Sequence, residues 1–409
     1  MFKAPEAART AAGPGWLSRL YCLVLCLSLM APVMAAAAPV RVGVMTMQPG
    51  EIFWERFGHN AVVIDDGERM TSYNFGFFDP GEDGFALNFV RGRMDYLLAA
   101  LPLEQDLAYY RRAGRGVSIQ WLDLDKTQRE FIAGHLQHLA KPENARYRYD
   151  YFTNNCATQV RDVVDAALSG RLQKQMSASS LGNSYRSETV RLAWPARWMA
   201  IGFDLGLNAK ADAALSRWQD AFIPMRLQDS LAEFRLADGR PLVRETEVLL
   251  EHKLMPPPDE LPRWSLAAMG IGLALGGVFF LAGMKYPKAF KAMALVYGGL
   301  CGLIGTVLLL IWIATEHRFA HGNANLLLFS PLSWLALVLY SICNRSAVGQ
   351  RAFTLTIMVL AGMAVLAVAL NLLDTDSQRN LNWILMALPA HWAISRTLLR
   401  QTEPKALSK

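Results

Sequence analysis

Five apolar stretches near the C-terminus constrain the fold of this chain more than any other feature. They cover residues 264–284, 290–314, 326–343, 353–373 and 382–400. A helix needs about 20 residues to cross the hydrocarbon core of a bilayer, and a helix satisfies all of its own backbone polar groups there. The stretches therefore predict an all-α polytopic membrane domain over residues 264–400, with about five transmembrane helices.

The charges between these stretches predict how the membrane domain is oriented. If the first span runs from outside to inside, the loops KYPKAFK and NRSAVGQRA and the tail from Arg396 face the cytoplasm. The loops TEHRFAHGNAN and DTDSQRN then face outward. Most of the Lys and Arg residues lie on the inner side in this arrangement, as the positive-inside rule requires. Residues 401–409 are then a cytoplasmic tail.

The N-terminus has the features of an export signal. Basic residues precede the apolar stretch LYCLVLCLSLMAPVMA, and the small residues AAAAP follow it. We expect a signal peptide at residues 1–38 and an exported domain at residues 39–250. A signal retained as an anchor would leave that domain on the same side of the membrane, so both alternatives place it in the periplasm.

The exported part reads as an α+β domain joined to the membrane by a spacer. In the segment HNAVVIDDGERMTSYNF, apolar and polar residues alternate on both sides of Asp66-Gly67. This pattern predicts a β-hairpin with a two-residue turn. Strands and helices come in blocks, which favours the α+β class. The proline run MPPPDELP predicts a stiff linker over residues 251–263. Apolar spacing predicts helices at 126–140, at 156–168 and, without defined bounds, within 171–250.

Composition argues against a nucleic-acid partner. The net charge is +6, but many of the Lys and Arg residues flank membrane spans, where orientation explains them. No basic tract is interleaved with aromatic residues as in a nucleic-acid groove. The membrane is the partner that the sequence predicts.

Cys156 is the only cysteine expected in the exported domain. Two others lie in the predicted signal and two in predicted spans, at positions 22, 26, 301 and 343. A thiol without a disulfide partner in an oxidising compartment is either deeply buried or used as a reactive group. The start of a helix, which Asn155 or Asn154 could cap, would stabilise a thiolate, and its free N–H groups could receive an oxyanion.

His59 is the histidine best placed to act as a base for Cys156. His135 and His138 lie on a predicted helix, where we expect them to pack against neighbours or face solvent. His252 lies next to the predicted linker. A two-residue hairpin turn would place His59 directly opposite Asn74, and a side-chain amide can hold an imidazole in one tautomer.

These residues predict a nucleophile, base and orienter, formed by Cys156, His59 and Asn74. A longer turn would shift the hairpin register and could bring Asp79 or another residue into the third position. The alternatives are an inert thiol, a core histidine and an ordinary hairpin asparagine. A zinc site and a serine nucleophile find less support, so we expect no metal and no cofactor.

The segments ERFGHNAVVIDDG, YNFGFFDP and YDYFTNNCATQVRDVVD resemble the N-terminal periplasmic domain of the Lnb family of bacterial lipoprotein N-acyltransferases. The resemblance covers most of residues 40–250. It implies a papain-like fold of the permuted NlpC type, with His59 and Cys156 as the catalytic pair. It also implies a bacterial inner-membrane protein with its catalytic domain in the periplasm.

The resemblance further implies a two-step reaction. An acyl chain passes from a membrane phospholipid to Cys156 as a thioester, and then to the N-terminal amine of a lipoprotein or to another envelope acceptor. A thioester is more reactive toward an amine than the original ester is. A periplasmic cysteine hydrolase and a non-catalytic envelope binding module remain alternatives, because one fold can host several functions.

The outward loop TEHRFAHGNANLLLFSP is a less distinctive feature of the same resemblance. Its residues His317, His321 and Asn325 lie just above a predicted span. They are candidates for contacts with lipid headgroups, and the alternative is that they are ordinary solvated residues of a short loop.

Overall fold

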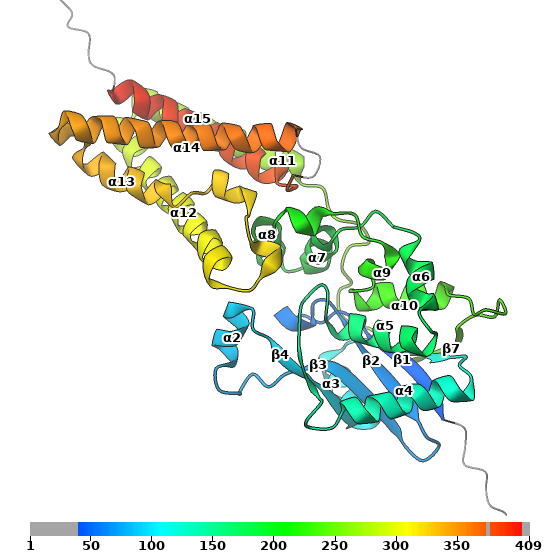
Figure 1. The fold of residues 1–409 in the computed structure, drawn as a ribbon. Helices are drawn as coiled ribbons and strands as arrows, with labels where there is room; N and C mark the ends of the chain where they lie inside the picture. The colour runs from blue at the N-terminus through cyan, green and yellow to red at the C-terminus, as the bar shows by residue number, and fades with distance from the viewer. Residues whose placement is uncertain (1–39, 374–376, 403–409) are drawn as a thin grey trace, which may run out of the picture. The chain divides into compact units, whose positions relative to one another are not determined.

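The computed structural model of the chain describes residues 40–373 and 377–402. The predicted signal peptide and residues 403–409 of the predicted tail lie outside them. The described residues form a sheet with covering helices and then a set of long apolar helices (Figure 1). The chain is therefore an α+β domain followed by a helical membrane domain, which confirms the predicted fold class.

One antiparallel sheet is the frame of the α+β domain. Its seven strands lie in the order β6-β4-β3-β2-β1-β5-β7. Consecutive strands β1, β2 and β3 are antiparallel neighbours; a short turn joins β2 to β3, and the longer segment 48–58 joins β1 to β2. The strands are β1 (Arg41–Met47), β2 (His59–Asp65), β3 (Met70–Phe77), β4 (Asp95–Pro102), β5 (Val117–Leu122), β6 (Arg146–Arg148) and β7 (Val243–Leu250).

Helices cover both faces of this sheet. One face carries α5 together with α4 and α10, and the other carries α3. The helices of the domain are α2 (Phe85–Arg91), α3 (Leu103–Ala113), α4 (Lys126–Leu139), α5 (Cys156–Ala167), α6 (Arg171–Ser177), α7 (Tyr185–Ala193), α8 (Arg197–Gly206), α9 (Arg217–Asp220) and α10 (Pro224–Glu233), with 3-10 turns η1 (Phe53–Glu55) and η2 (Ala209–Asp212).

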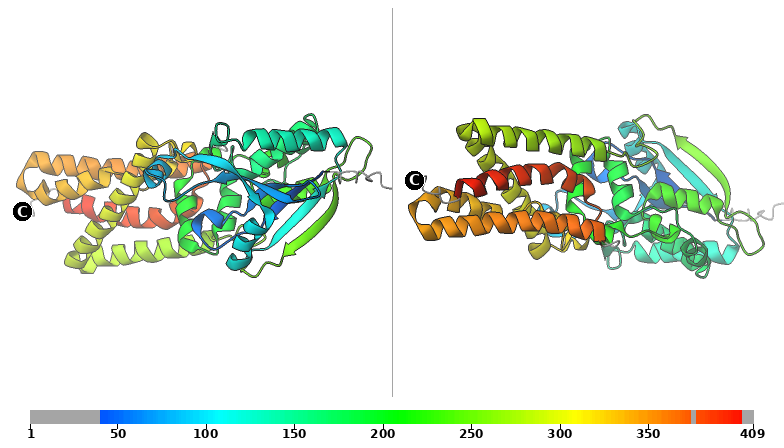
Figure 2. Two further views of the ribbon diagram at one scale, coloured as in Figure 1. Left: turned by 90° about the horizontal axis from the view of Figure 1, so that it is seen from below. Right: turned by 90° about the horizontal axis from the view of Figure 1, so that it is seen from above.

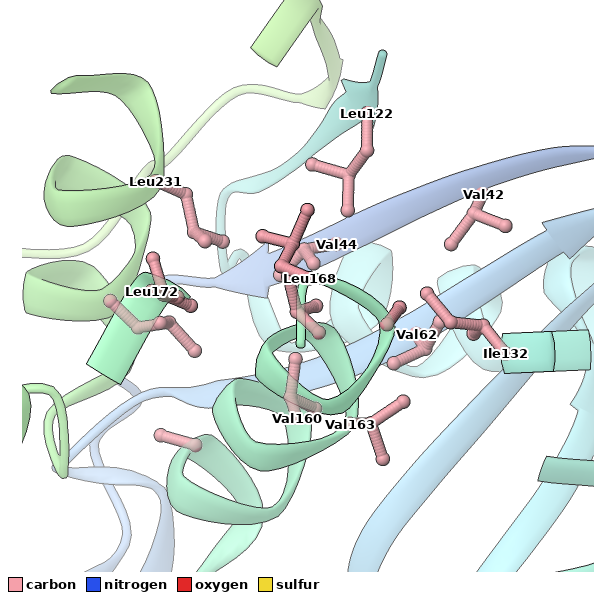
Figure 3. Packing of buried hydrophobic residues seen from close by; sticks show 14 of the residues in the cluster. Val42, Val44, Val62, Leu122, Ile132, Val160, Val163, Leu168, Leu172 and Leu231 are labelled. Atoms are coloured by element: carbon pink, nitrogen blue, oxygen red, sulfur yellow. The ribbon is translucent and has the colours of Figure 1, made fainter. Parts of the chain in front are cut away.

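The central strands are nearly continuous in apolar sequence because both of their faces are buried. Val44 and Val62 pack against Val160 of α5 on one face, as Figure 3 shows. Met45 of β1 and Val63 of β2 face α3 on the other side of the sheet. A fully buried side chain of this size contributes roughly 1.5–3 kcal/mol, so these contacts hold α5 and α3 against β1 and β2.

The hairpin exists, but its predicted register is wrong. The turn is longer than two residues, with Asp65 paired to Met70, so Asn74 pairs with Ala61. The Asp66 carboxylate accepts the backbone N–H groups of residues 68 and 69, which stabilises the longer turn. The region 171–250 is largely helical, as predicted, but its last eight residues form strand β7.

Four segments of the membrane domain are long and apolar enough to cross a bilayer. They are Ser265–Lys285, Pro287–Ala314, Arg318–Ile342 and Ala347–Leu373. The fifth predicted stretch forms helix α15 (Leu381–Thr402), whose His391 and Arg396 lower its hydropathy, so a fifth crossing stays a prediction. The other helices are α11 (Ser265–Lys285), α12 (Pro287–Ala314), α13 (Leu332–Ile342) and α14 (Ala347–Leu373), with 3-10 turns η3 (Arg318–Ala320), η4 (Ala324–Leu327) and η5 (Cys343–Arg345).

Glycines let the membrane helices approach closely. Helix α15 packs along α11 and α14, and the three helices lie side by side in both views of Figure 2. A Cβ atom on Gly272 would lie 2.1 Å from the carbonyl oxygen of Leu385, and one on Gly276 would lie 2.7 Å from Pro389. These two glycines therefore serve helix packing, as expected for small residues at such spacing.

Candidate functional site

Helix α5 begins at Cys156, and its cap holds the thiol at the helix N-terminus. Asn155 is the N-cap, with its Oδ1 accepting the N–H of Thr158 at 2.9 Å and its own N–H donating to the Thr158 hydroxyl at 2.8 Å. The Asn155 amide nitrogen donates to two further carbonyls. The side chain of Asn154 instead donates to the carbonyl of Arg148. Asn155 is therefore the cap, and the N–H of Cys156, the first residue of α5, is the group left for an oxyanion.

The structure brings His59 and Asn74 to this thiol. His59 forms a hydrogen bond with Cys156 through their side chains. Its Nε2 lies 3.1 Å from Oδ1 of Asn74. The two residues meet diagonally across β2 and β3 instead of directly, because the side chain of Asn74 reaches along the sheet.

Asp106 fixes the orientation of Asn74 and was not found from the sequence. Nδ2 of Asn74 donates to Oδ2 of Asp106 at 2.8 Å, and the hydroxyl of Ser72 donates to the same oxygen at 2.7 Å. A carboxylate only accepts, so the Asn74 amide must turn its oxygen toward His59. The imidazole then carries its proton on Nε2, which leaves Nδ1 as the base for the thiol.

The electrostatics of the pair favour a thiolate beside an imidazolium. Burial is the largest influence on Cys156 and raises its pKa, but the charge and hydrogen bond of His59 outweigh it. With backbone N–H groups of Asn60 and Ala157 also bonded to the sulfur, the pKa of Cys156 is lowered. Burial likewise acts against the charged form of His59, yet the Cys156 thiolate and then the Asp106 carboxylate raise its pKa.

A large and mainly apolar cavity opens beside the thiol. Its volume is about 1360 Å³, and its lining includes Cys156 and His59 together with aromatic side chains such as Phe75 and Tyr149. Pockets for small ligands usually span about 300–1,000 Å³, so this cavity has room for a longer molecule. The lining extends to Ile311, a residue of the span formed by α12.

The outer loop, residues 315–325 between α12 and α13, forms part of the cavity wall. Its Arg318 lies 2.8 Å from the carboxylate of Asp150 and donates to the hydroxyl of Thr153 at 3.2 Å. Phe319 packs edge-on against Phe152, with ring centroids 4.7 Å apart. The outer loop thus contacts the segment that leads directly into the Cys156 helix.

Two of the three candidates for headgroup contacts line this cavity. They are His317 and His321. Asn325 is fully buried; its amide nitrogen donates to the carbonyl of Leu205, and its oxygen accepts from Asn380. Asn325 therefore holds the outer loop in place, and its side chain is not free to contact a lipid.

The remaining histidines of the α+β domain lie away from the thiol. His135 stacks on Phe131 on α4, and His138 lies next to Asn144. His252 accepts the N–H of Gly116. Within residues 40–373 and 377–402, no group of three or more His, Cys, Asp or Glu side chains is arranged to hold a metal.

We expect Asp106→Asn to slow acylation of the Cys156 thiol by a reactive ester, used as a probe, roughly tenfold or more, because a hydrogen bond to a charged group contributes roughly 1.5–3 kcal/mol. Loss of the Asp106 charge lowers the pKa of His59, so the alkaline limb of the pH–rate profile moves to lower pH. The rate of Cys156 acylation as a function of pH measures both effects. Ser72→Ala is the control, since it removes a bond to Asp106 and keeps the charge. An alkaline limb that stays in place in Asp106→Asn contradicts the positioning role.

Family comparisons match both parts of the chain. The Lnb N-terminal periplasmic domain matches residues 35–193, and the Lnb transmembrane domain matches residues 266–373. The first match contains Cys156 and His59, and the second contains the outer loop. No curated protein and no solved structure was found to match this chain.

Proposed function

We propose that this chain, which belongs to the Lnb-type family, is a membrane-bound cysteine acyltransferase that moves an acyl chain from a phospholipid to the N-terminal amine of a lipoprotein. Cys156 is the nucleophile, His59 the acid and base, and Asn74 the orienter. The proposal places the protein in the bacterial inner membrane, with a signal at residues 1–38, the catalytic domain in the periplasm and a linker at residues 251–263.

One observation carries this proposal. The thiol with a lowered pKa, beside a histidine, lies in a cavity that is large, apolar and partly walled by the outer loop of the membrane domain. A site for a soluble peptide would not need a wall from a membrane helix. A site for an acyl chain gains from apolar walls that are continuous with the bilayer.

The first step is the acylation of Cys156. The thiolate attacks the carbonyl carbon of a phospholipid ester, and the oxyanion that forms is met by the N–H of Cys156 at the start of α5. The tetrahedral intermediate then breaks its bond to the glycerol oxygen. The His59 imidazolium gives its proton to that oxygen, so lysophospholipid leaves and the acyl group stays on sulfur as a thioester.

The second step returns the enzyme to its starting state. The neutral α-amine of the acceptor attacks the thioester carbonyl, and Nδ1 of His59 takes the proton that the nitrogen loses. Collapse of the intermediate breaks the carbon–sulfur bond and forms an amide. The Cys156 thiolate and the His59 imidazolium are thereby restored.

Acyl transfer is tested on the full chain in phospholipid vesicles. We expect intact mass to gain one acyl group on Cys156, and this group to pass to a diacylated lipopeptide when the lipopeptide is added. Decay of the adduct to free fatty acid in the presence of lipopeptide would instead identify a hydrolase. No adduct, together with an unreactive thiol, would favour the binding module and reject catalysis.

A further inference from the structure

Helices α2 and α8 present an apolar surface that no part of residues 40–373 and 377–402 covers. We call it the α2–α8 band and define it by Leu87 and Val90 of α2 and by Trp198 and Ile201 of α8. These side chains are 53%, 63%, 69% and 50% exposed. Single exposed apolar residues are common, but a contiguous group beside a large cavity marks an interaction site.

The rings of the 3-10 turn η1 join the two helices into one surface. Phe53 contacts Phe89 of α2, with ring centroids 6.1 Å apart, and stacks on Trp198 of α8 at 6.4 Å. It also stacks on Phe203 at 6.1 Å. The exposed residues of the α2–α8 band therefore lie on a common aromatic base.

One apolar face of α8 leads from the α2–α8 band to the membrane helices. Trp198, Ile201 and Leu205 follow one another at positions i, i+3 and i+7, which places them on one face of α8. Leu205 packs against a cluster made by the membrane helices, which includes Phe329 and Trp383. The same apolar face is thus covered by membrane helices at one end and uncovered at the other.

The outer loop fixes both helices at the outer end of the spans. The amide nitrogen of Asn323 donates to the last carbonyls of α8, at 2.8 Å for Leu205 and 2.9 Å for Gly206. The N–H of Glu316 donates to the carbonyl of Arg91, the last residue of α2. Both helices are therefore bonded at their C-terminal ends to the segment that joins α12 to α13.

Residues of α2, α8 and α12 line the cavity that holds Cys156. Its lining includes Phe89 of α2, Gly202 and Phe203 of α8 and Ile311 of α12. A Cβ atom on Gly202 would meet no neighbour within 4 Å, so this side of α8 is open.

We propose that the α2–α8 band lies in the outer leaflet of the bilayer and that an acyl chain enters the cavity between α2, α8 and the outer end of α12. The occupant is phospholipid because the uncovered face continues a face already packed on membrane helices. Trp and Arg are typical of the membrane interface, and Arg197 stacks on Trp194 beside the band, 4.0 Å from the ring centroid. The entry route rests on the proposed acyl transfer, whereas the membrane contact does not.

The membrane contact is tested on the full chain in vesicles of phosphatidylcholine brominated in the acyl chains, which quench nearby tryptophans. We expect Trp198→Phe to lower the quenched part of the fluorescence. The matched control is Trp218→Phe, since Trp218 lies under Arg161 in the α+β domain, and it should leave the quenched part unchanged. Equal quenched fluorescence in wild type and Trp198→Phe overturns the proposal, and it is the result expected if a protein partner covers the band.

The entry route is tested by comparing two acyl donors on Cys156. We expect the double variant Trp198→Gln, Ile201→Gln to acylate roughly tenfold more slowly from vesicle phospholipid, because buried apolar contact with the leaflet is lost. Acylation from a water-soluble short-chain ester should be unchanged. The control is Phe131→Gln, an exposed residue of α4, which should alter neither rate. If the double variant loses the same fraction of its acylation rate with both donors, the entry route is rejected. If the wild type accepts only the soluble ester, phospholipid transfer is rejected, and the quenching result still tests the membrane contact.

Discussion

Cys156→Ser is expected to abolish acyl transfer, with a fall of roughly 10⁵–10⁶-fold, as is found when a catalytic nucleophile is removed. The side chain keeps its size, so the core of α5 and the Asn155 cap remain in place. The helix N-terminus and His59 lower the pKa of the Cys156 thiol, which favours the thiolate. The pKa of a serine hydroxyl is much higher, so the hydroxyl does not ionise in the same environment. The acyl adduct and the transferred product, both followed by mass, give the measurement.

Two controls keep this result interpretable. The variant should unfold at the same temperature as wild type, which excludes misfolding. Of the cysteines that the structure describes, Cys301 and Cys343 are buried in the membrane domain, so in a chain cleaved after the predicted signal, which holds Cys22 and Cys26, rapid labelling by iodoacetamide should disappear together with Cys156. Substantial transfer by Cys156→Ser would show that the acyl group is carried elsewhere and would refute the proposed mechanism.

His59→Ala is expected to slow acylation by roughly 10²–10⁴-fold, the contribution of a general acid and base. A second effect comes from the pKa of Cys156, which rises when the neighbouring imidazolium is lost. At neutral pH, alkylation by iodoacetamide then slows about tenfold for each unit by which the thiol pKa rises. The alkylation rate as a function of pH separates this effect from the loss of proton transfer.

The pH dependence of the wild type follows from the same pair. Activity falls as pH drops through the lowered pKa of Cys156, because the thiolate is protonated. It also falls as pH rises through the raised pKa of His59, because the imidazolium that protonates the leaving group is lost. In His59→Ala the alkaline fall should vanish and the acid limb should move to higher pH. An acid limb that stays at the wild-type pH would mean that His59 does not stabilise the thiolate.

The features predicted correctly from the sequence are local ones. The cap at Asn155, the helix that starts at Cys156 and the apolar stretches each depend on residues close together in the chain, where spacing carries the information. The hairpin register depends on how Asp66 bonds to the turn, and a two-residue signature does not contain that information. The register was therefore wrong although the strands were right.

The features missed from the sequence depend on contacts between distant segments. Asp106 lies on α3, far along the chain from its partners in β3, and no periodicity relates the two. Arg318 of the outer loop lies 168 residues beyond Asp150 in the chain, and the two still meet in the segment that leads into the Cys156 helix. Only the packing of the two domains shows that a loop between two spans helps to enclose the cavity.

The bonds between the outer loop and α8 also bear on the role of the proline-rich linker. A tether of that length could let a domain sample many heights above a membrane. Asn323 on the carbonyl end of α8 and Arg318 on Asp150 hold the domain independently of the tether, and the linker itself accepts a bond from Arg191 at Pro258. These bonds set the distance of Cys156 from the membrane domain, so in the proposed transfer the reactive group of an acceptor must reach Cys156 at that distance.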